Sequence, residues 1–217
     1  MIVRTPIAVR PMRSANLTTL FFEDRNGPAG MDYYIKGAVC WPEPTSTPGT
    51  TRDGYAILAG QDVQTGHLIL FEEFDFATVP HWFNAHGGLI RMGLEQLFAD
   101  AWSKYRCRSW FTAQDDLTHQ RHARQVWESK NVAPMPEFIR VPYPPDVQQG
   151  ILNEAADIGR FTGDSRRGLR KQWEIYEAHP DLDNPPEAVK ALMILLSGYE
   201  FIPWVERRDR IQKEVFV

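Results

Sequence analysis

The chain has 217 residues, of which 43% are hydrophobic and 24% charged, as is ordinary for one folded domain with or without arms. Its formal net charge of −4 argues against a uniformly basic nucleic-acid-binding surface and leaves room for a local basic face. No apolar run approaches the roughly 18 residues that span a bilayer, and the N-terminus lacks a signal-peptide pattern. We therefore expect a cytoplasmic protein that does not bind membranes.

The first 30 residues combine prolines, the turn-like sequence N-G-P-A-G and the basic residues Arg4, Arg10 and Arg13. This composition predicts an extended N-terminal arm over 1–30 with a short strand at 18–22. Such an arm packs on a partner, on the sheet of its own chain, or on nothing.

Three apolar runs follow, at 32–41, 54–60 and 67–74, separated by a Pro/Thr/Gly-rich loop and by the turn D-V-Q-T-G. Runs of β-branched and aromatic residues with turn signals between them predict an antiparallel meander. Cys40 in the first run and Cys107 further along fit no metal or redox spacing, so both are predicted to be reduced core residues.

Beyond residue 88 the apolar period changes to that of a helix, with a stripe from Leu89 to Trp102. The rest of the chain predicts a strand at 108–114, a helix at 117–129, a strand at 136–143, a helix at 147–158, a helix beginning near Asp164 or Ser165, and a helix that Asn184 caps and Gly198 ends. Residues 201–217 form a charged tail. The order β-β-β-α-β-α-β-α predicts one α/β domain over 31–200, a mixed sheet with helices on both faces.

Two carboxylates, Asp115 and Asp116, close the apolar run R-S-W-F-T-A-Q-D-D. Ligands of open α/β sheets bind beyond the carboxyl ends of the strands, so these side chains are candidates for a functional site. The same residues can also serve as the N-cap of the helix that follows.

The order of elements resembles that of ribonuclease H-like (RNase H-like) folds, over about residues 32–198. Three segments resemble the C-terminal nuclease domain of phage large terminase subunits: the block R-D-G-Y-A-I-L-A-G-Q-D-V-Q-T-G-H-L-I-L-F-E-E-F, the strand that ends in Asp115 and Asp116, and L-D-N-P-P-E-A-V-K-A-L at 182–192. The resemblance implies a metal-dependent endonuclease that acts on double-stranded DNA during phage genome packaging.

For the site, the resemblance implies Mg²⁺ or Mn²⁺ held by Asp115, Asp183 and Glu187, with Asp116 and Glu43 as further catalytic candidates. Hydrolysis by two such ions needs several carboxylates that converge on one point. The implied location is the cytoplasm of a phage-infected host cell, and other packaging proteins are possible partners.

The chain departs from the terminase pattern at Trp41, which stands before Pro42 where the family has a metal-bridging Asp. An indole cannot ligate a hard cation. Three alternatives follow: Glu43 replaces the missing ligand, Asp53 replaces it from the far side of the loop, or the site is inactive. In the last case the chain is an RNase H-like module that binds DNA or protein.

A basic cluster of Arg166, Arg167, Arg170 and Lys171 is a candidate DNA-backbone contact, and a solvated helix surface is the equal alternative. His119 and His122 could hold a transition metal, but a solvated helix face is favoured. For His81 and His86, a packed connector is favoured over a lid or substrate role. The Gly87-Gly88 pair allows a phosphate-binding interpretation. The sequence has no P-loop, so no ATPase motor is expected.

Overall fold

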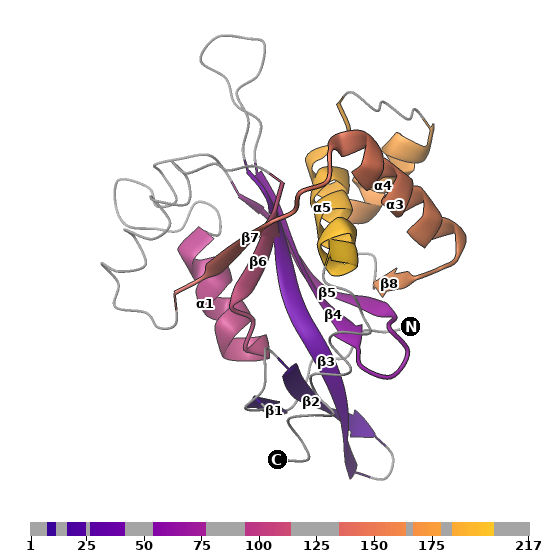
Figure 1. The fold of residues 1–217 in the computed structure, drawn as a ribbon. Helices are drawn as coiled ribbons and strands as arrows, with labels where there is room; N and C mark the ends of the chain where they lie inside the picture. The colour runs from indigo at the N-terminus through magenta and orange to yellow at the C-terminus, as the bar shows by residue number, and fades with distance from the viewer. Residues whose placement is uncertain are drawn as a thin grey trace.

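Among the described residues, eight strands form one mixed sheet that has helices on both faces (Figure 1). This computed structural model describes residues 8–11, 17–24, 27–41, 54–76, 94–113, 135–163, 167–178 and 184–201. The strands are β1 (Ala8–Pro11), β2 (Leu17–Asp24), β3 (Gly27–Cys40), β4 (Gly54–Asp62), β5 (Leu68–Phe76), β6 (Ser109–Thr112), β7 (Glu137–Arg140) and β8 (Phe161–Gly163). The helices are α1 (Leu94–Tyr105), α3 (Pro145–Asp157), α4 (Arg167–Ala178) and α5 (Glu187–Phe201).

The predicted antiparallel meander is confirmed as β3, β4 and β5. The turn between β4 and β5 is closed by Asp62, whose Oδ1 accepts hydrogen bonds from the backbone N–H groups of Gln64 at 2.7 Å and Thr65 at 2.8 Å. Gly66 follows with a φ of 74°, a conformation that glycine adopts without strain. Local turn chemistry therefore fixes the register of this hairpin.

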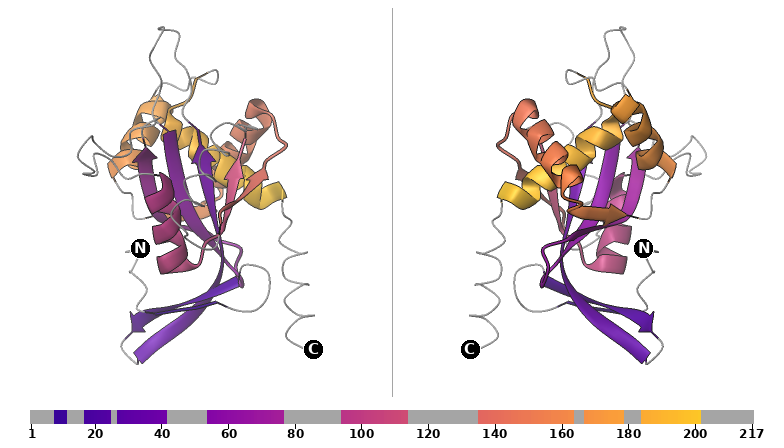
Figure 2. Two further views of the ribbon diagram at one scale, coloured as in Figure 1. Left: turned by 90° about the vertical axis from the view of Figure 1, so that its left-hand side faces the viewer. Right: turned by 90° about the vertical axis from the view of Figure 1, so that its right-hand side faces the viewer.

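On its other edge, β3 pairs with β2 and with the parallel strand β6, and β7 continues the sheet parallel to β6. Tyr33 and Tyr34 pair with both β2 and β4, so β2 must lie on the edge of β3 opposite β4. The predicted strand at 18–22 is thus confirmed as part of β2, and β1 and β2 pack on the sheet of their own chain. Figure 2 shows β2 and the first half of β3 projecting beyond the helices.

Side-chain alternation along β3 builds two hydrophobic cores, one on each face of the sheet. Ile35, Val39 and Trp41 pack with Phe98 and Trp110 in the core beneath α1. Tyr34, Ala38 and Cys40 face the opposite core, which the residues of α3, α4 and α5 complete. The prediction of helices on both faces is therefore confirmed. Cys40 and Cys107 are buried and form no disulfide, as predicted.

Helix α5 lies between the sheet and the other two helices of its face, and its residues are buried on nearly all sides. The prediction that this helix ends at Gly198 was wrong, because it continues to Phe201. A Cβ on Gly198 would lie 2.3 Å from the ring of Phe111, so this glycine permits close packing of the helix on β6.

A β-bulge in β5 changes which face its side chains occupy. Leu58 of β4 pairs with Glu72 while Ala59 pairs with Leu70, so Phe71 is the extra residue. Phe71 and Glu72 consequently both face α1, and Glu73 faces α4. Strand β8, which pairs parallel to β5 through three residues, was not predicted.

The remaining predicted elements have mixed outcomes. Helices α1, α3 and α4 and strands β6 and β7 correspond to predicted elements, with shifted boundaries. The predicted helix at 117–129, the histidines at 81, 86, 119 and 122, and the Gly87-Gly88 pair lie outside the described residues.

Candidate active site at the carboxyl ends of β3 and β6

The two central parallel strands end side by side. Val39 of β3 is level with Thr112, the last residue of β6. Helix α5 begins at this same end, whereas its last turn lies further back along the sheet (Figures 1 and 2). There Tyr199 donates from its hydroxyl to the carbonyls of Tyr34 at 2.8 Å and Ala59 at 3.0 Å. The edge beyond β3 and β6, called the candidate edge below, therefore has two neighbouring strand ends, and α5 begins at the same end of the sheet, next to α4.

Trp41 occupies the position directly after β3, where the resemblance implies a metal-bridging carboxylate. Its side chain is only 3% exposed, and its Nε1–H donates to Oγ1 of Thr112 at 2.9 Å. Its ring lies 5.4 Å from that of Phe138. Trp41 is therefore a core residue of the α1 face that bridges the ends of β3 and β6.

Glu187 is the one predicted metal ligand that lies in a described segment. It is partly buried in the first turn of α5, where its negative charge interacts favourably with the helix dipole. Beside it, the backbone N–H of Ala188 donates to Oε1 of Gln172 in α4 at 2.9 Å, which fixes the start of α5 against α4. The structure thus places this carboxylate at the start of α5, beside α4.

The other predicted site residues are only partly described. Asp115, Asp116, Asp183, Glu43 and Arg166 lie outside the described residues, as does the side chain of Arg167. Within the described segments, no three His, Cys, Asp or Glu side chains lie together as a metal-binding group. Of the implied metal ligands, the described residues therefore include Glu187 alone.

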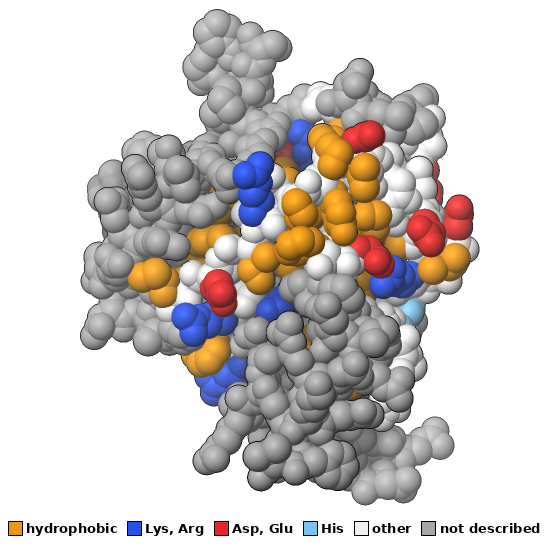
Figure 3. Space-filling view, in the orientation of Figure 1, with side chains coloured by type: hydrophobic (Ala, Val, Ile, Leu, Met, Phe, Trp, Pro, Cys, Tyr) orange, Lys and Arg blue, Asp and Glu red, His pale blue; other side chains and the backbone are white. Residues whose placement is uncertain are grey.

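Arg170 and Lys171 of the predicted basic cluster are exposed on α4. Arg170 forms an ion pair of 2.8 Å with Glu174, in which the two side chains are 64% and 59% exposed. Such an exposed pair contributes little stability, so the guanidinium remains accessible to another anion. On the face in Figure 3, by contrast, positive and negative side chains are interspersed around a hydrophobic area over the β7–α3 connection.

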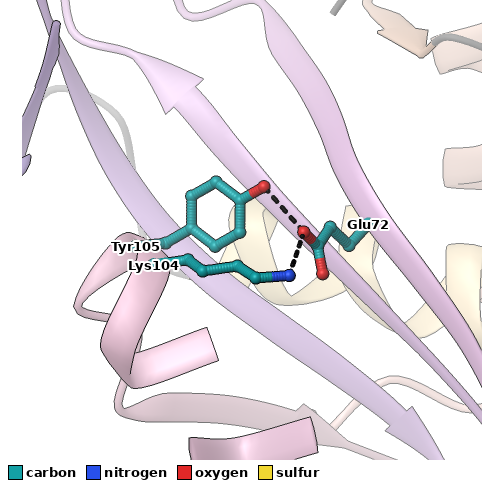
Figure 4. Close-up of polar contacts among 3 residues, drawn as sticks. All are labelled: Glu72, Lys104 and Tyr105. Atoms are coloured by element: carbon teal, nitrogen blue, oxygen red, sulfur yellow. Dashed lines mark hydrogen bonds and ion pairs between the residues drawn. The ribbon is translucent and has the colours of Figure 1, made fainter. Parts of the chain in front are cut away.

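Two carboxylates with specific hydrogen-bond partners were not predicted from the sequence. Both belong to the F-E-E-F segment of β5. Glu72 is 8% exposed and accepts from the hydroxyl of Tyr105 at 2.9 Å and from Nζ of Lys104 at 3.2 Å (Figure 4). Glu73 accepts from Tyr55 and from the first turn of α4. The available signal was two adjacent charges inside an apolar strand, because buried charges need partners.

Burial also changes the acidity of two groups beneath α1. It raises the pKa of the Cys107 thiol to about 12. Burial, together with the negative charge of Asp62, raises the pKa of Tyr33 to about 12. Both groups are therefore neutral near pH 7 and act as core residues.

Compared with known proteins, the chain matches no family model, no curated protein and no solved structure. No helix in the described parts of the chain has both the length and the apolarity needed to cross a membrane.

Proposed function

We propose that the chain is an RNase H-like domain that acts as a metal-dependent DNA endonuclease of the phage terminase type. Two features support the fold assignment. A three-stranded antiparallel meander continues into the parallel strands β6 and β7, and helices cover both faces of the sheet. This succession is the one that the resemblance implies.

One observation carries the proposal for activity: β3 and β6 are parallel neighbours that end together at the edge where α5 begins. Asp115 and Asp116 follow β6 within a few residues, and Asp183 precedes Glu187 by four positions. We infer that carboxylates from these two parts of the sequence meet beyond this edge, where ligands of such sheets bind.

In the proposed site, Asp115, Asp183 and Glu187 hold Mg²⁺ or Mn²⁺, and Asp116 and Glu43 complete the acidic set. When bound, the metal lowers the pKa of water and neutralises charge on a phosphate. The protein residues bind the ions and orient the DNA backbone. The proposed substrate is double-stranded DNA, the setting is genome packaging in the host cytoplasm, and other packaging proteins are the proposed partners.

Nicking of supercoiled plasmid by the full chain tests this proposal. We expect relaxed product with Mn²⁺, none with EDTA, and loss of cleavage in Asp115→Ala and Glu187→Gln. Glu154→Gln, which alters an exposed carboxylate of α3, is the matched control and should cleave like the wild type. Plasmid that stays intact with every divalent ion, or cleavage that both site variants retain, contradicts the enzymatic proposal.

A second candidate function is favoured by the burial of Trp41 and its hydrogen bond to Thr112. The indole fills the place of the implied bridging carboxylate. In this second proposal the domain is a catalytically inactive module that binds DNA or protein. This alternative predicts DNA binding that is equal with Mn²⁺ and EDTA, and no cleavage. Saturable Mn²⁺ binding that depends on Asp115 and Asp183 contradicts it.

A further inference from the structure

The carboxylate of Glu73 accepts three hydrogen bonds, from donors in β4 and α4. Its Oε2 accepts from the hydroxyl of Tyr55 at 2.7 Å and from the backbone N–H of Leu169 at 2.9 Å. Its Oε1 accepts from the backbone N–H of Gly168 at 3.2 Å. A strand residue therefore caps the N-terminus of α4 from outside the helix, the position in which a negative charge stabilises a helix most.

Gly168 makes this close approach possible. A Cβ at this position would lie 2.6 Å from the hydroxyl oxygen of Tyr55. Only glycine lets the first turn of α4 lie directly on the Glu73–Tyr55 pair without displacing it. The cap by Glu73 and the close packing at Gly168 therefore both fix the position of the start of α4.

The sheet register shows where this position lies relative to the candidate edge. Glu73 is level with Ile57, which is level with Ala38, which in turn is level with Phe111. Thr112 follows Phe111 directly, and Trp41 lies three positions after Ala38, about 10 Å along an extended strand. The start of α4 is therefore held close to the level at which β3 and β6 end.

The cap also determines how α4 can bind an anion. Because Glu73 already accepts from the N–H groups of Gly168 and Leu169, these groups are not available for a phosphate. Leu169, Trp173 and Tyr176 pack toward the core, so Arg170 and Lys171 lie on the outer face. An anion that binds α4 would therefore contact these exposed side chains, and Arg170 would exchange its weak ion pair with Glu174 for the anion.

We propose that Glu73, supported by Tyr55, is a positioning residue that holds α4 at the candidate edge so that Arg170 and Lys171 contact the phosphate backbone of double-stranded DNA. The inference rests on the proposed function, because it assumes that DNA is the substrate or ligand. Glu73 lies in β5, on the other side of β3 from β6, and the terminase resemblance implies no role for it.

Binding of a labelled duplex to the full chain, measured by fluorescence anisotropy at several salt concentrations in EDTA, tests the inference. Combining Arg170→Ala with Lys171→Ala should make the slope of log K against log salt concentration shallower by about 2. This is roughly one unit for each lost phosphate contact. Glu73→Gln should weaken binding about three- to tenfold although it removes no positive charge. Hydrogen exchange at Gly168 and Leu169 should become faster, and Tyr55→Phe should show the same changes to a smaller degree.

Glu72→Gln is the matched control, since it alters the adjacent carboxylate on the opposite face of the same strand. It should lower the melting temperature and leave DNA affinity unchanged, which separates positioning from general destabilisation. If the Arg170/Lys171 variant loses affinity and Glu73→Gln behaves like Glu72→Gln, the inference fails and the proposed function stands. If the wild type binds no DNA, both the proposed function and this inference are contradicted.

Discussion

The indole N–H of Trp41 donates to the hydroxyl oxygen of Thr112 across 2.9 Å and joins the ends of β3 and β6. We predict that Trp41→Phe, which keeps an aromatic ring but removes this buried hydrogen bond, lowers the free energy of unfolding by about 1–3 kcal/mol. Denaturation in urea measures the change. Thr112→Val removes the other partner of the bond, so the double variant should cost less than the sum of the two single variants. Strictly additive costs contradict a direct Trp41–Thr112 interaction.

Two glycines in helices allow the same substitution to be compared in opposite environments. Gly198→Ala places a Cβ 2.3 Å from the ring of Phe111, whereas a Cβ on Gly150 of α3 would meet no atom within 4 Å. Overpacking should make Gly198→Ala destabilising by about 1–3 kcal/mol, despite the better helix propensity of alanine. Gly150→Ala should be stabilising by about 0.5–1 kcal/mol.

Thermal and urea unfolding of the two glycine variants provide the measurement. The variant Gly198→Ala combined with Phe111→Leu, in which the flat ring is replaced, should recover part of the lost stability. Equal effects of alanine at 150 and 198 contradict the close packing of α5 on β6.

The buried Glu72 is held by two donors of unequal importance (Figure 4). Tyr105 is buried and donates at 2.9 Å, whereas Lys104 is 50% exposed and lies 3.2 Å away. We expect Tyr105→Phe to cost about 1–2 kcal/mol, because it leaves a buried acceptor poorly satisfied. Lys104→Ala should cost less than about 1 kcal/mol, since water screens an exposed ion pair. A larger loss for Lys104→Ala than for Tyr105→Phe contradicts this ranking.

The meander was predictable because its signals are local. Apolar runs and the D-V-Q-T-G turn define β4 and β5, and Asp62 closes the turn with its own side chain. The role of Gly198 was not predictable in this way. A glycine after an apolar helical stripe is a common end signal, and only the neighbouring Phe111 shows that it serves close packing instead.

The candidate site was predictable only in part. The acidic end of 108–116 and the start of the last helix could be located in the sequence, but the parallel pairing of β3 with β6 is a long-range contact that local patterns do not reveal. The partners of Glu72 and Glu73 depend on a bulge at Phe71, which alternation does not reveal. Strand β8 has only three residues, which is too short to show the alternation of apolar and polar residues that predicts a strand.

Stability should fall at alkaline pH because of Cys107 and Tyr33. Both pKa values are raised to about 12 in the folded protein, from 9.0 for the thiol and 10.0 for the phenol. Above pH 9 the unfolded chain therefore binds fewer protons than the folded chain, so the free energy of unfolding decreases as pH rises. The expected slope is about 1.4 kcal/mol per pH unit for Cys107, and it steepens above pH 10 as Tyr33 contributes.

Urea denaturation over pH 8 to 12 measures this slope. Cys107→Ala removes the buried thiol and should flatten the curve between pH 9 and 10, although the variant is less stable at neutral pH. A curve of unchanged slope in Cys107→Ala contradicts the assignment to this thiol.

The central claim is that carboxylates from distant parts of the chain meet at one sheet edge to hold a divalent ion. The most direct measurement is a Mn²⁺ binding isotherm for the wild type, Glu187→Gln and the control Glu154→Gln. We predict saturable binding that is weakened at least about tenfold in Glu187→Gln, since a ligand is lost, and unchanged in Glu154→Gln. Absence of saturable Mn²⁺ binding, or identical isotherms for the two variants, contradicts the claim.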